Sequence, residues 1–314
     1  MMSETVGVAV ITHCSKHHLQ RCLPQLLQSP LKPRVLVVNS SSNDGTVEEA
    51  ERLGAETLVV PRASFNHGST RERARKFLGT DIVVMITPDA YAIDTSMLTN
   101  LLEPILSKKA SLAYAKQIPR EGAGFLEGFL RDFNYPEISH IRGIEDVAKW
   151  GVYSFFCSNS CAAYRNSALD EVGGFPSVLT AEDAFTAANL LRKGHKIAYV
   201  AEAVVKHSHD YTLFQELRRH FDTGYVRKQH AHLLNFGSTD QQRGRQYFVE
   251  LNKRLAKQQP MLLPYAWAHT AAKFLGYALG RLGPRMPLAL AKRLSSQDFY
   301  WNSDDFHRQR MEKS

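Results

Sequence analysis

The stretch DIVVMITPDA, residues Asp81–Ala90, places five consecutive apolar residues ahead of a polar, acidic turn. An apolar run of this length, rich in β-branched residues, is typical of a strand that is buried on both faces of a sheet. Asp89 then falls in the loop beyond the carboxyl end of the strand. An aspartate at this place is a candidate ligand for a cation, although turns and helix N-termini also favour aspartate.

Segments on the N-terminal side repeat the pattern. VGVAVITH (Val6–His13), RVLVVNS (Arg34–Ser40) and ETLVVP (56–61) each predict a strand. Helices are predicted around Leu19–Leu27 and over Val47–Gly54, the second closed by its glycine. Strands that alternate with helices predict an α/β fold with a Rossmann-like, mostly parallel sheet flanked by helices.

Polar residues follow two of these strands. Ligands of such sheets bind beyond the carboxyl ends of the strands, where Ser40–Thr46 and Thr87–Ala90 are expected to lie. The small polar side chains of VVNSSSNDGT can hydrogen-bond a base and a ribose. Turns between strands and helices favour the same residue types, so this loop alone is not specific.

A second acidic site is predicted at the start of a helix. AEDAFTAANLLRKGHK (Ala181–Lys196) is helical in pattern and carries Glu182 and Asp183 in its first turn. Carboxylates there also suit the helix dipole, so a capping role remains open. The preceding SFFCSNSCAAYR (154–165) predicts a further buried strand, and Glu121–Lys149 predicts a loop and short helix over the sheet edge.

Two histidines follow the last predicted strands. KIAYVAEAVVKHSH predicts one or two closing strands, and KHSHDY (Lys206–Tyr211) carries His207 and His209. A lone histidine is more often structural than functional. Histidines separated by one residue face the same side of a strand, and this favours a role at a metal or a phosphate.

The charge of the chain is unevenly distributed. The net charge is +8, but residues 1–212 carry 22 Lys/Arg against 23 Asp/Glu, a net −1. Residues 213–314 carry 17 against 8, a net +9. This excess predicts a basic C-terminal region with an anionic partner, either a nucleic acid or a membrane surface rich in anionic lipid.

The C-terminal region reads as an α-helical extension. Amphipathic helices are predicted in 213–230 and 240–259, and Leu262–Gly283 is helical and mostly apolar. His269, Lys273 and Arg281 argue against a transmembrane span. An interfacial helix on a membrane fits this segment, followed by the basic RMPLALAKRLS. A core helix of a helical subdomain is the alternative.

Whole-chain features indicate a globular protein. The composition is 44% hydrophobic and 22% charged. Four scattered cysteines provide neither a disulfide scaffold nor two pairs for zinc, so free thiols in a reducing cytoplasm are expected. The N-terminal residues run from MMSET directly into a predicted strand, without the pattern of a signal peptide.

The two acidic sites suit the two demands of glycosyl transfer from a nucleotide. A divalent cation, Mg²⁺ or Mn²⁺, can neutralise the leaving diphosphate, and such hard cations prefer carboxylate oxygen, which Asp89 supplies. An inverting transfer also needs a carboxylate that accepts the proton of the acceptor hydroxyl. Glu182 and Asp183 are candidates for that base.

Six motifs stand in a characteristic order: VGVAVITH, VVNSSSNDGT, FNHGSTRERAR, VVMITPDA, GGFPSVLTAEDAFTAANLLRKGHKIAYV and VVKHSHDY. In this order the chain resembles the family-2 inverting glycosyltransferases of the GT-A fold. More narrowly it resembles the bacterial rhamnosyltransferase-like branch, in which FNHG-x-TR and a TQDA-type motif recur and a short aromatic sequence such as FYW (Phe299–Trp301) closes the chain. The resemblance covers residues 1–212 well and the rest loosely.

The resemblance implies a role for residues in most of these motifs. Asp183 would be the general base with Glu182 beside it, Asp89 the second acid of a DxD-like metal motif, and His207 a group near the metal. The residues that would bind the donor, its pyrimidine, ribose, diphosphate or sugar, are Thr12, Asn39, Ser41, Asp44, His67, Gly68, Arg71 and Thr87.

The chain departs from the family pattern at three places. The first strand ends in Thr12-His13-Cys14 in place of threonine, an aromatic and asparagine, and the second ends in Asn39 in place of aspartate. The metal motif reads Thr87-Pro88-Asp89, without the first acid. Without the first acid, the metal would be held weakly, or partly replaced by His207 and nearby cations.

The sequence therefore predicts a nucleotide-sugar-binding, catalytic GT-A domain at 1–212 and a basic helical region at 213–314. The expected reaction is transfer of L-rhamnose from dTDP-L-rhamnose to a lipid-linked or cell-surface polysaccharide, by an enzyme held at the cytoplasmic face of the membrane. UDP- or GDP-hexose donors are alternatives within the same fold.

Two other classes of protein are less well supported. A nucleic-acid-binding protein would use the basic tail, but no helix-turn-helix, zinc or RNP signature is present, and no nucleic-acid partner is expected. A nucleotidyltransferase would need a Gly-rich phosphate loop after the first strand, where this chain reads THCSKHH.

Overall fold

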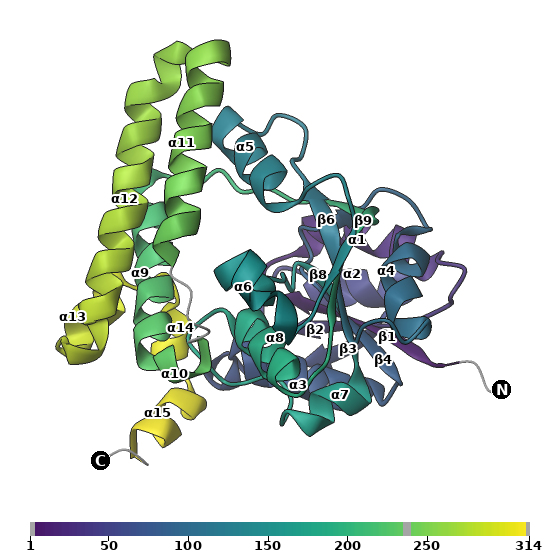
Figure 1. Cartoon of the computed structure of the whole chain (residues 1–314). Helices are drawn as coiled ribbons and strands as arrows, with labels where there is room; N and C mark the ends of the chain where they lie inside the picture. Colours follow the sequence, from purple (N-terminus) through teal and green to yellow (C-terminus); the bar gives the residue numbers. More distant parts are fainter. Residues whose placement is uncertain (1–3, 235–239, 312–314) are drawn as a thin grey trace.

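The computed structural model describes residues 4–234 and 240–311. A single mixed sheet forms the centre of the N-terminal part, with helices on both of its faces, and a group of long helices from the C-terminal part stands beside it (Figure 1). No signal peptide was expected at the start of the chain. Residues 1–3 of that segment lie outside the described residues.

The sheet is built from nine strands within the described residues, in the order β3-β2-β1-β4-β8-β6-β9-β5, with β7 paired to β9. The strands are β1 (Val6–Thr12), β2 (Arg34–Asn39), β3 (Glu56–Val59), β4 (Ile82–Ile86), β5 (Tyr91–Ala92), β6 (Leu112–Ile118), β7 (His140–Arg142), β8 (Cys161–Arg165) and β9 (Ile197–Lys206).

The direction of the strands confirms the predicted α/β class and adds one feature. Strands β1 to β4 are mutually parallel, as are β6 and β9. Strand β8 runs antiparallel between β4 and β6, with Ile86 opposite Cys161. The first residue of β8 therefore lies beside the last residue of β4, so the residues that precede Cys161 join the edge that carries Asp89. The segment 154–160, expected to be strand, instead forms a 3₁₀ turn and loop.

Helices cover both faces of this sheet because its strands are apolar on both sides. In β1, Val8 and Val10 belong to the core beneath one face, while Ala9 and Ile11 belong to the core beneath the other. The helices of this part are α1 (Lys16–Leu27), α2 (Thr46–Leu53), α3 (His67–Leu78), α4 (Met97–Leu106), α5 (Phe125–Asn134), α6 (Val147–Trp150), α7 (Asn166–Glu171) and α8 (Glu182–Arg192).

The C-terminal part is helical, as predicted. Its helices are α9 (Leu213–Gln229), α10 (Ala231–Leu234), α11 (Asp240–Gln258), α12 (Leu263–Leu282), α13 (Leu288–Leu294), α14 (Asp298–Trp301) and α15 (Asp304–Met311). Helices α11 and α12 stand side by side as a hairpin along α9 (Figure 1). No helix within the described ranges is long and apolar enough to span a membrane.

Helix α12 is packed on one side only. Gly276 and Gly280 lie against α9, where an added Cβ atom would stand 2.1 Å from the carbonyl oxygens of Leu217 and Phe221. Small residues thus allow close approach of the two helices, while Trp267 and Phe274 remain 52% and 74% exposed. The core interpretation of Leu262–Gly283 thus holds for the face against α9, and the interfacial interpretation of the exposed face stays a prediction.

The end of the chain returns to the α/β part. Trp301 is fully buried in a cluster with Phe221 of α9 and Leu179. Phe299 packs edge-on against Phe65 and His67, with ring centroids 5.0 and 5.3 Å apart. The aromatic sequence Phe299–Trp301 therefore joins the helical part to the start of α3.

Candidate active site

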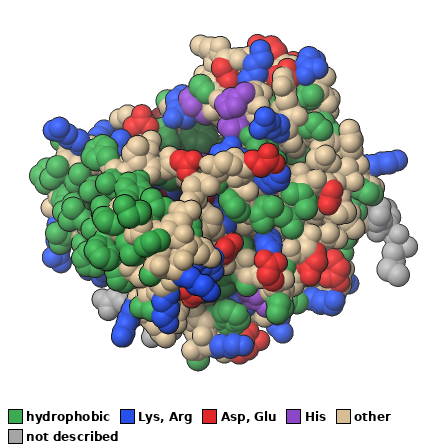
Figure 2. Space-filling view, turned by 90° about the horizontal axis from the view of Figure 1, so that it is seen from above, with side chains coloured by type: hydrophobic (Ala, Val, Ile, Leu, Met, Phe, Trp, Pro, Cys, Tyr) green, Lys and Arg blue, Asp and Glu red, His purple; other side chains and the backbone are tan. Residues whose placement is uncertain are grey.

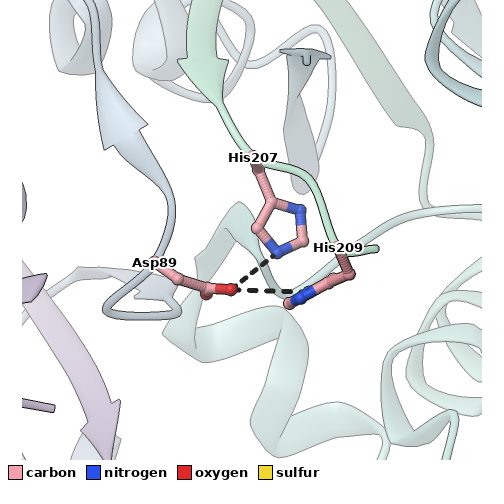
Figure 3. Close-up of side chains that lie close together, drawn as sticks. All are labelled: Asp89, His207 and His209. Atoms are coloured by element: carbon pink, nitrogen blue, oxygen red, sulfur yellow. Dashed lines mark ion pairs between the residues drawn. The ribbon is translucent and has the colours of Figure 1, made fainter. Parts of the chain in front are cut away.

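Three side chains from two loops meet at the carboxyl edge of the sheet. Asp89 follows β4, and His207 and His209 follow β9. The Nε2 atoms of both histidines lie 3.4 Å from Oδ2 of Asp89 (Figure 3). One ligand atom from each of the three residues lies within 4.8 Å of the ligand atoms of the other two. Atoms at this spacing can bind one metal ion together.

The hydrogen bonds of His207 fix which of its nitrogens faces Asp89. The Gln117 amide nitrogen donates to Oγ of Ser158 at 3.0 Å, so its oxygen is left to accept from Nδ1 of His207 at 2.9 Å. With Nδ1 bound to Gln117, the ring directs Nε2 toward the Asp89 carboxylate. Metal-binding histidines are commonly held in this way by a hydrogen bond at the other nitrogen.

The loop of His207 and His209 is held in place on both sides. Arg131 of α5 donates to the carbonyl oxygen of His207 at 2.9 Å, and its ion-pair partner Glu127 accepts from the backbone N–H of His209. Arg120 donates to the carbonyl oxygen of Ser208. Because β9 ends at Lys206, these contacts, and not the alternation of a strand, direct both imidazoles to Asp89.

The electrostatics of this cluster favour a cation. Burial acts to raise the pKa of Asp89, but the His207 and His209 rings outweigh it and hold the pKa below its ordinary value. Burial, with the neighbouring His207, lowers the pKa of His209 to about 4. A carboxylate and two imidazoles are a ligand set suited to a divalent cation such as Mn²⁺. The residues present therefore fit the expected cofactor.

The second acid, Asp183, lies at the start of α8. Its Oδ2 accepts from the backbone N–H of Asn159 at 3.1 Å and its Oδ1 from that of Ala184 at 2.8 Å. The preceding Ala181 has φ 62°, in the left-handed region that non-glycine residues rarely adopt. Burial, and then the neighbouring Glu182, raise the pKa of Asp183 to about 6. A carboxylate with this pKa can accept a proton near neutral pH.

Glu182 is tied to the FNHG motif at the start of α3. It forms a buried ion pair with Arg71 at 2.9 Å, and both side chains are more than nine-tenths buried. Arg71 also donates to the carbonyl oxygen of His67 at 3.1 Å. Burial raises the pKa of Glu182, but Arg71 outweighs this and keeps it below its ordinary value. Glu182 is thus a fixed negative charge beside Asp183.

Asn159 connects these groups, and sequence reasoning did not identify it. Its amide nitrogen donates to Oε1 of Glu182 at 3.0 Å, while its oxygen accepts from the Tyr164 hydroxyl at 2.7 Å. Its neighbour Ser158 holds Gln117, which in turn holds His207. One network therefore runs from the Asp89 cluster to Asp183. The sequence signal was SNS before a buried strand, whose antiparallel direction could not be read.

The predicted base-and-ribose loop lies at the same edge. Thr12 donates to the carbonyl oxygen of Val38 at 3.0 Å, and Asn39 binds both Oγ and the backbone N–H of Ser42 at 2.8 Å. Ser41 has φ 54° and donates to the carbonyl oxygen of Val60. These contacts give the loop a defined shape.

Asp44 is anchored from several sides. It accepts from the hydroxyls of Ser42 and Thr46 and from the backbone N–H of Lys16, at the start of α1. Burial acts to raise its pKa, but these hydrogen bonds outweigh it and lower the pKa to about 2. Asp44 is therefore ionised and joins the loop to α1.

The remaining predicted donor residues are His67, Gly68, Arg71 and Thr87. Arg71 is buried with Glu182, and His67 is half-buried; desolvation, followed by Arg71, lowers the pKa of His67 to about 4. Gly68 has a packing reason of its own, since an added Cβ atom would lie 1.8 Å from the carbonyl oxygen of Pro176. Thr87 stands two residues before Asp89, and its N–H donates to the carbonyl oxygen of Ser160.

A sheet edge with small polar loops, a candidate cation site and a nearby carboxylate of raised pKa are the features of a GT-A glycosyltransferase. A sequence comparison agrees, because the model of the family described as "Glycosyl transferase family 2" matches residues 7–173. The chain belongs to that family.

Two curated relatives are similar over almost the whole chain. The O-antigen chain rhamnosyltransferase RfbN of Salmonella typhimurium is 36% identical over 286 residues, which cover 90% of this chain and 91% of the relative. The O-antigen chain rhamnosyltransferase WbaN of Salmonella anatum is 36% identical over 273 residues, 86% of each chain. These matches confirm the predicted rhamnosyltransferase-like branch, including its C-terminal part.

Solved structures confirm the fold. The mannosyltransferase PcManGT of Pyrobaculum calidifontis, in complex with GDP-Man and Mn²⁺, superposes with a TM-score of 0.58 at 19% identity, covering 96% of this chain and 86% of its own. Residues 1–349 of S. aureus TarS, in complex with UDP-GlcNAc, give 0.55 at 17% identity, covering 97% and 92%.

Proposed function

We propose that this enzyme transfers L-rhamnose from dTDP-L-rhamnose, with inversion at the anomeric carbon, to a lipid-linked or cell-surface polysaccharide. The observation that carries the proposal is the single network that joins Asp183 to the Asp89–His207–His209 cluster. The network brings the Asp183 carboxylate and this cluster to one edge of the sheet, which supports an in-line displacement that uses a proton acceptor and a cation. The choice of rhamnose and of a polysaccharide rests on the two O-antigen relatives.

In the proposed reaction, Asp183 accepts the proton of an acceptor hydroxyl while that oxygen attacks the anomeric carbon. The bond from this carbon to the diphosphate oxygen breaks, and the nucleoside diphosphate leaves with the electron pair. Glu182, fixed by Arg71 and Asn159, holds a negative charge beside Asp183 and so raises its basicity.

Asp89, His207 and His209 would hold Mg²⁺ or Mn²⁺, which supplies charge neutralisation to the leaving diphosphate when bound. The nitrogen-containing ligand set favours Mn²⁺ over Mg²⁺, because Mg²⁺ prefers oxygen ligands throughout.

The donor site would be formed by the loop after β2 and the end of β1. Thr12, Asn39 and Ser41 would bind the pyrimidine and ribose, with Asp44 shaping the loop. UDP- and GDP-hexoses remain alternative donors in the same pocket, since PcManGT and TarS of similar fold are in complex with GDP-Man and UDP-GlcNAc.

The direct test is a donor panel. Thermal unfolding is measured with dTDP-L-rhamnose, UDP-glucose, UDP-GlcNAc and GDP-mannose, with and without Mn²⁺. We expect the largest Mn²⁺-dependent rise in Tm with dTDP-L-rhamnose, and release of dTDP on turnover. Release of pyrophosphate would indicate a nucleotidyltransferase, and stabilisation by another sugar nucleotide alone would overturn the rhamnose assignment.

A membrane surface is the proposed site of action. The C-terminal region carries the net +9 charge, and Figure 2 shows hydrophobic side chains gathered over the C-terminal helices, with Lys and Arg around them. Exposed side chains there include Met261, Trp267, Phe274 and Leu275. A basic surface with apolar side chains supports reversible binding to anionic lipid. Flotation with anionic vesicles, and its loss with neutral vesicles or high salt, is the expected result.

A further inference from the structure

A groove opens beside the metal cluster, between the α/β part and the C-terminal helices. It has a volume of about 390 Å³ and lies between α5, the segment 209–212, α9 and α12. His209 lines the groove and also faces Asp89, so the groove and the candidate cation site share one residue. A ligand in this groove would therefore lie next to the reaction centre.

The walls of the groove combine aromatic and aliphatic surfaces. Tyr211 stacks on the His209 ring with centroids 5.0 Å apart. Arg219 of α9 lies 4.1 Å from the centre of the Tyr211 ring. Tyr265 of α12 is 46% exposed and lines the same space, as do Leu126 and Leu130 of α5. Faces of this kind suit the apolar side of a sugar ring, which presents its C–H groups.

Polar groups converge at the base of the groove on α9 and α12. Glu216 is buried and lies 3.3 Å from Nε2 of His269 and 3.6 Å from Nζ of Lys273. His220 is a further partner of Glu216 at 3.3 Å. His269 is 94% buried, and its Nδ1 atom has no hydrogen-bond partner among the described residues. This buried group of Glu216, His269 and Lys273 gives the base of the groove a polar character.

The charges of the groove argue for a neutral ligand. The carboxylates of Glu127, Asp210 and Glu216 line it together with the cation Lys273. Glu127 and Glu216 are already paired, with Arg131 and with the His269–Lys273 group. An additional phosphate would meet three carboxylates, whereas hydroxyl groups can donate to them without such repulsion. A mostly apolar cleft with a few convergent polar groups, at the junction of two parts of a chain, is the usual form of a small-molecule site.

We infer that this groove binds the terminal, neutral saccharide of the acceptor and presents its hydroxyl to the reaction centre. The inference rests on the proposed glycosyl transfer and assigns the acceptor subsite to α5, α9 and α12. The C-terminal helices then complete the active site, in addition to any contact with lipid. The exposed apolar side chains Trp267, Phe274 and Leu275 of α12 do not line the groove and leave that contact open.

The first test fills the groove from a glycine. Gly124 lines it, has φ −67° and offers space for a side chain, since the nearest atom to an added Cβ is Oδ1 of Asp210 at 3.7 Å. Gly124→Phe should block the groove without straining the backbone. The matched control is Gly128→Phe on the same helix, where an added Cβ meets no atom within 4 Å and the residue does not line the groove.

The second test removes an aromatic face. Tyr265→Ala should raise the KM for the acceptor about tenfold, in line with the contribution of one aromatic contact. Phe77→Ala is the control, since Phe77 of α3 is an exposed aromatic residue that lies outside both the groove and the C-terminal region. Both variants should retain the donor KM of the unmodified enzyme.

Each variant is assayed in two ways. Transfer of radiolabelled rhamnose is measured with lipid-linked saccharides extracted from cells that lack this enzyme. Slow hydrolysis of dTDP-L-rhamnose is measured without acceptor, and it reports on the donor and cation sites alone.

We expect Gly124→Phe to lower transfer at least tenfold and Tyr265→Ala to raise the acceptor KM, with donor hydrolysis unchanged and both controls near the unmodified rate. Unchanged transfer in both groove variants would overturn the acceptor assignment, and so would an equal loss in the controls. Absence of both donor hydrolysis and transfer in the unmodified enzyme would instead contradict the proposed function on which the assignment rests.

Discussion

The site has two acidic halves, one around Asp183 and one around Asp89. They differ in how far protein groups supply hydrogen bonds and counterions to the carboxylates. Both oxygens of Asp183 accept backbone N–H groups, and its neighbour Glu182 has Arg71 as a counterion. At the other half, the Asp89 carboxylate faces two imidazole nitrogens at 3.4 Å. Protein groups alone satisfy the Asp183 carboxylate, whereas the proposed cation would complete the Asp89 cluster.

This difference predicts different kinds of failure. Damage at Asp183 should affect the chemical step and leave ligand affinities alone, because its surroundings are protein groups. Damage at Asp89 should appear first as weakened cation affinity, which excess metal can partly restore. Each prediction below tests one half against the other.

The largest effect is expected for Asp183→Asn. The amide is nearly isosteric but cannot accept the proton, so kcat should fall about 10²- to 10⁴-fold, the range for loss of a general base. The Kd for dTDP-L-rhamnose, measured by titration calorimetry, should stay within about twofold because Asp183 is proposed to act on the acceptor. Near-normal turnover would exclude Asp183 as the base, and a matching loss of donor affinity would place it in the donor site.

Asp89→Asn should lower the affinity for Mn²⁺ about a hundredfold, since the ligand loses its charge. Activity should vanish at low Mn²⁺ and partly return at millimolar Mn²⁺, measured as rate against cation concentration. EDTA should abolish activity of the unmodified enzyme, with Mn²⁺ restoring it. Full activity in EDTA would show that Asp89 is structural and that the two halves do not differ in the way described.

Gln117→Leu should weaken Mn²⁺ binding about tenfold, the lower range for loss of a group that orients a metal ligand. Gln117 touches His207 at Nδ1 and contacts Ser158, so its removal frees the imidazole to rotate or change tautomer. The rate at saturating Mn²⁺ should be close to that of the unmodified enzyme. A fall in this saturated rate with unchanged cation affinity would assign Gln117 to the Asp183 half.

Sequence reasoning identified the acids of both halves from their places in the predicted elements. Asp89 follows a buried strand and Asp183 begins a helix, and both positions depend on local pattern, which one sequence contains. The same logic predicted the alternating α/β order of the first four strands.

The residues that join the halves could not be predicted in the same way. Asn159 and Ser158 lie at this edge because β8 runs antiparallel to β4, and a buried apolar strand carries no mark of its direction. Arg71 and Gly68 belong to a motif associated with the donor, yet the structure gives Arg71 the partner Glu182 and packs Gly68 against Pro176. Long-range pairs of this kind depend on tertiary packing, which local patterns do not encode.

The smallest effect concerns pH and compares the halves most directly. Asp183 acts as a base only when ionised, so activity should fall as the pH drops through about 6, the pKa to which burial and Glu182 raise this carboxyl. Protonation of His209 would act at lower pH, since burial and the neighbouring His207 lower the pKa of this imidazole to about 4. The acidic limb of the rate profile therefore belongs to the Asp183 half.

The Glu182→Gln variant distinguishes an acidic limb caused by protonation of Asp183 from one caused by protonation in the metal half. It removes the negative charge beside Asp183 and leaves the positive Arg71 nearby, and both changes favour the ionised carboxylate. The acidic limb of kcat/KM should therefore move to lower pH by up to about one unit. Glu171→Gln, which alters an exposed carboxylate paired with His195, should leave the limb in place. If the acidic limb does not move in Glu182→Gln but shifts with Mn²⁺ concentration, the limb arises from the metal half. That result would contradict its assignment to Asp183.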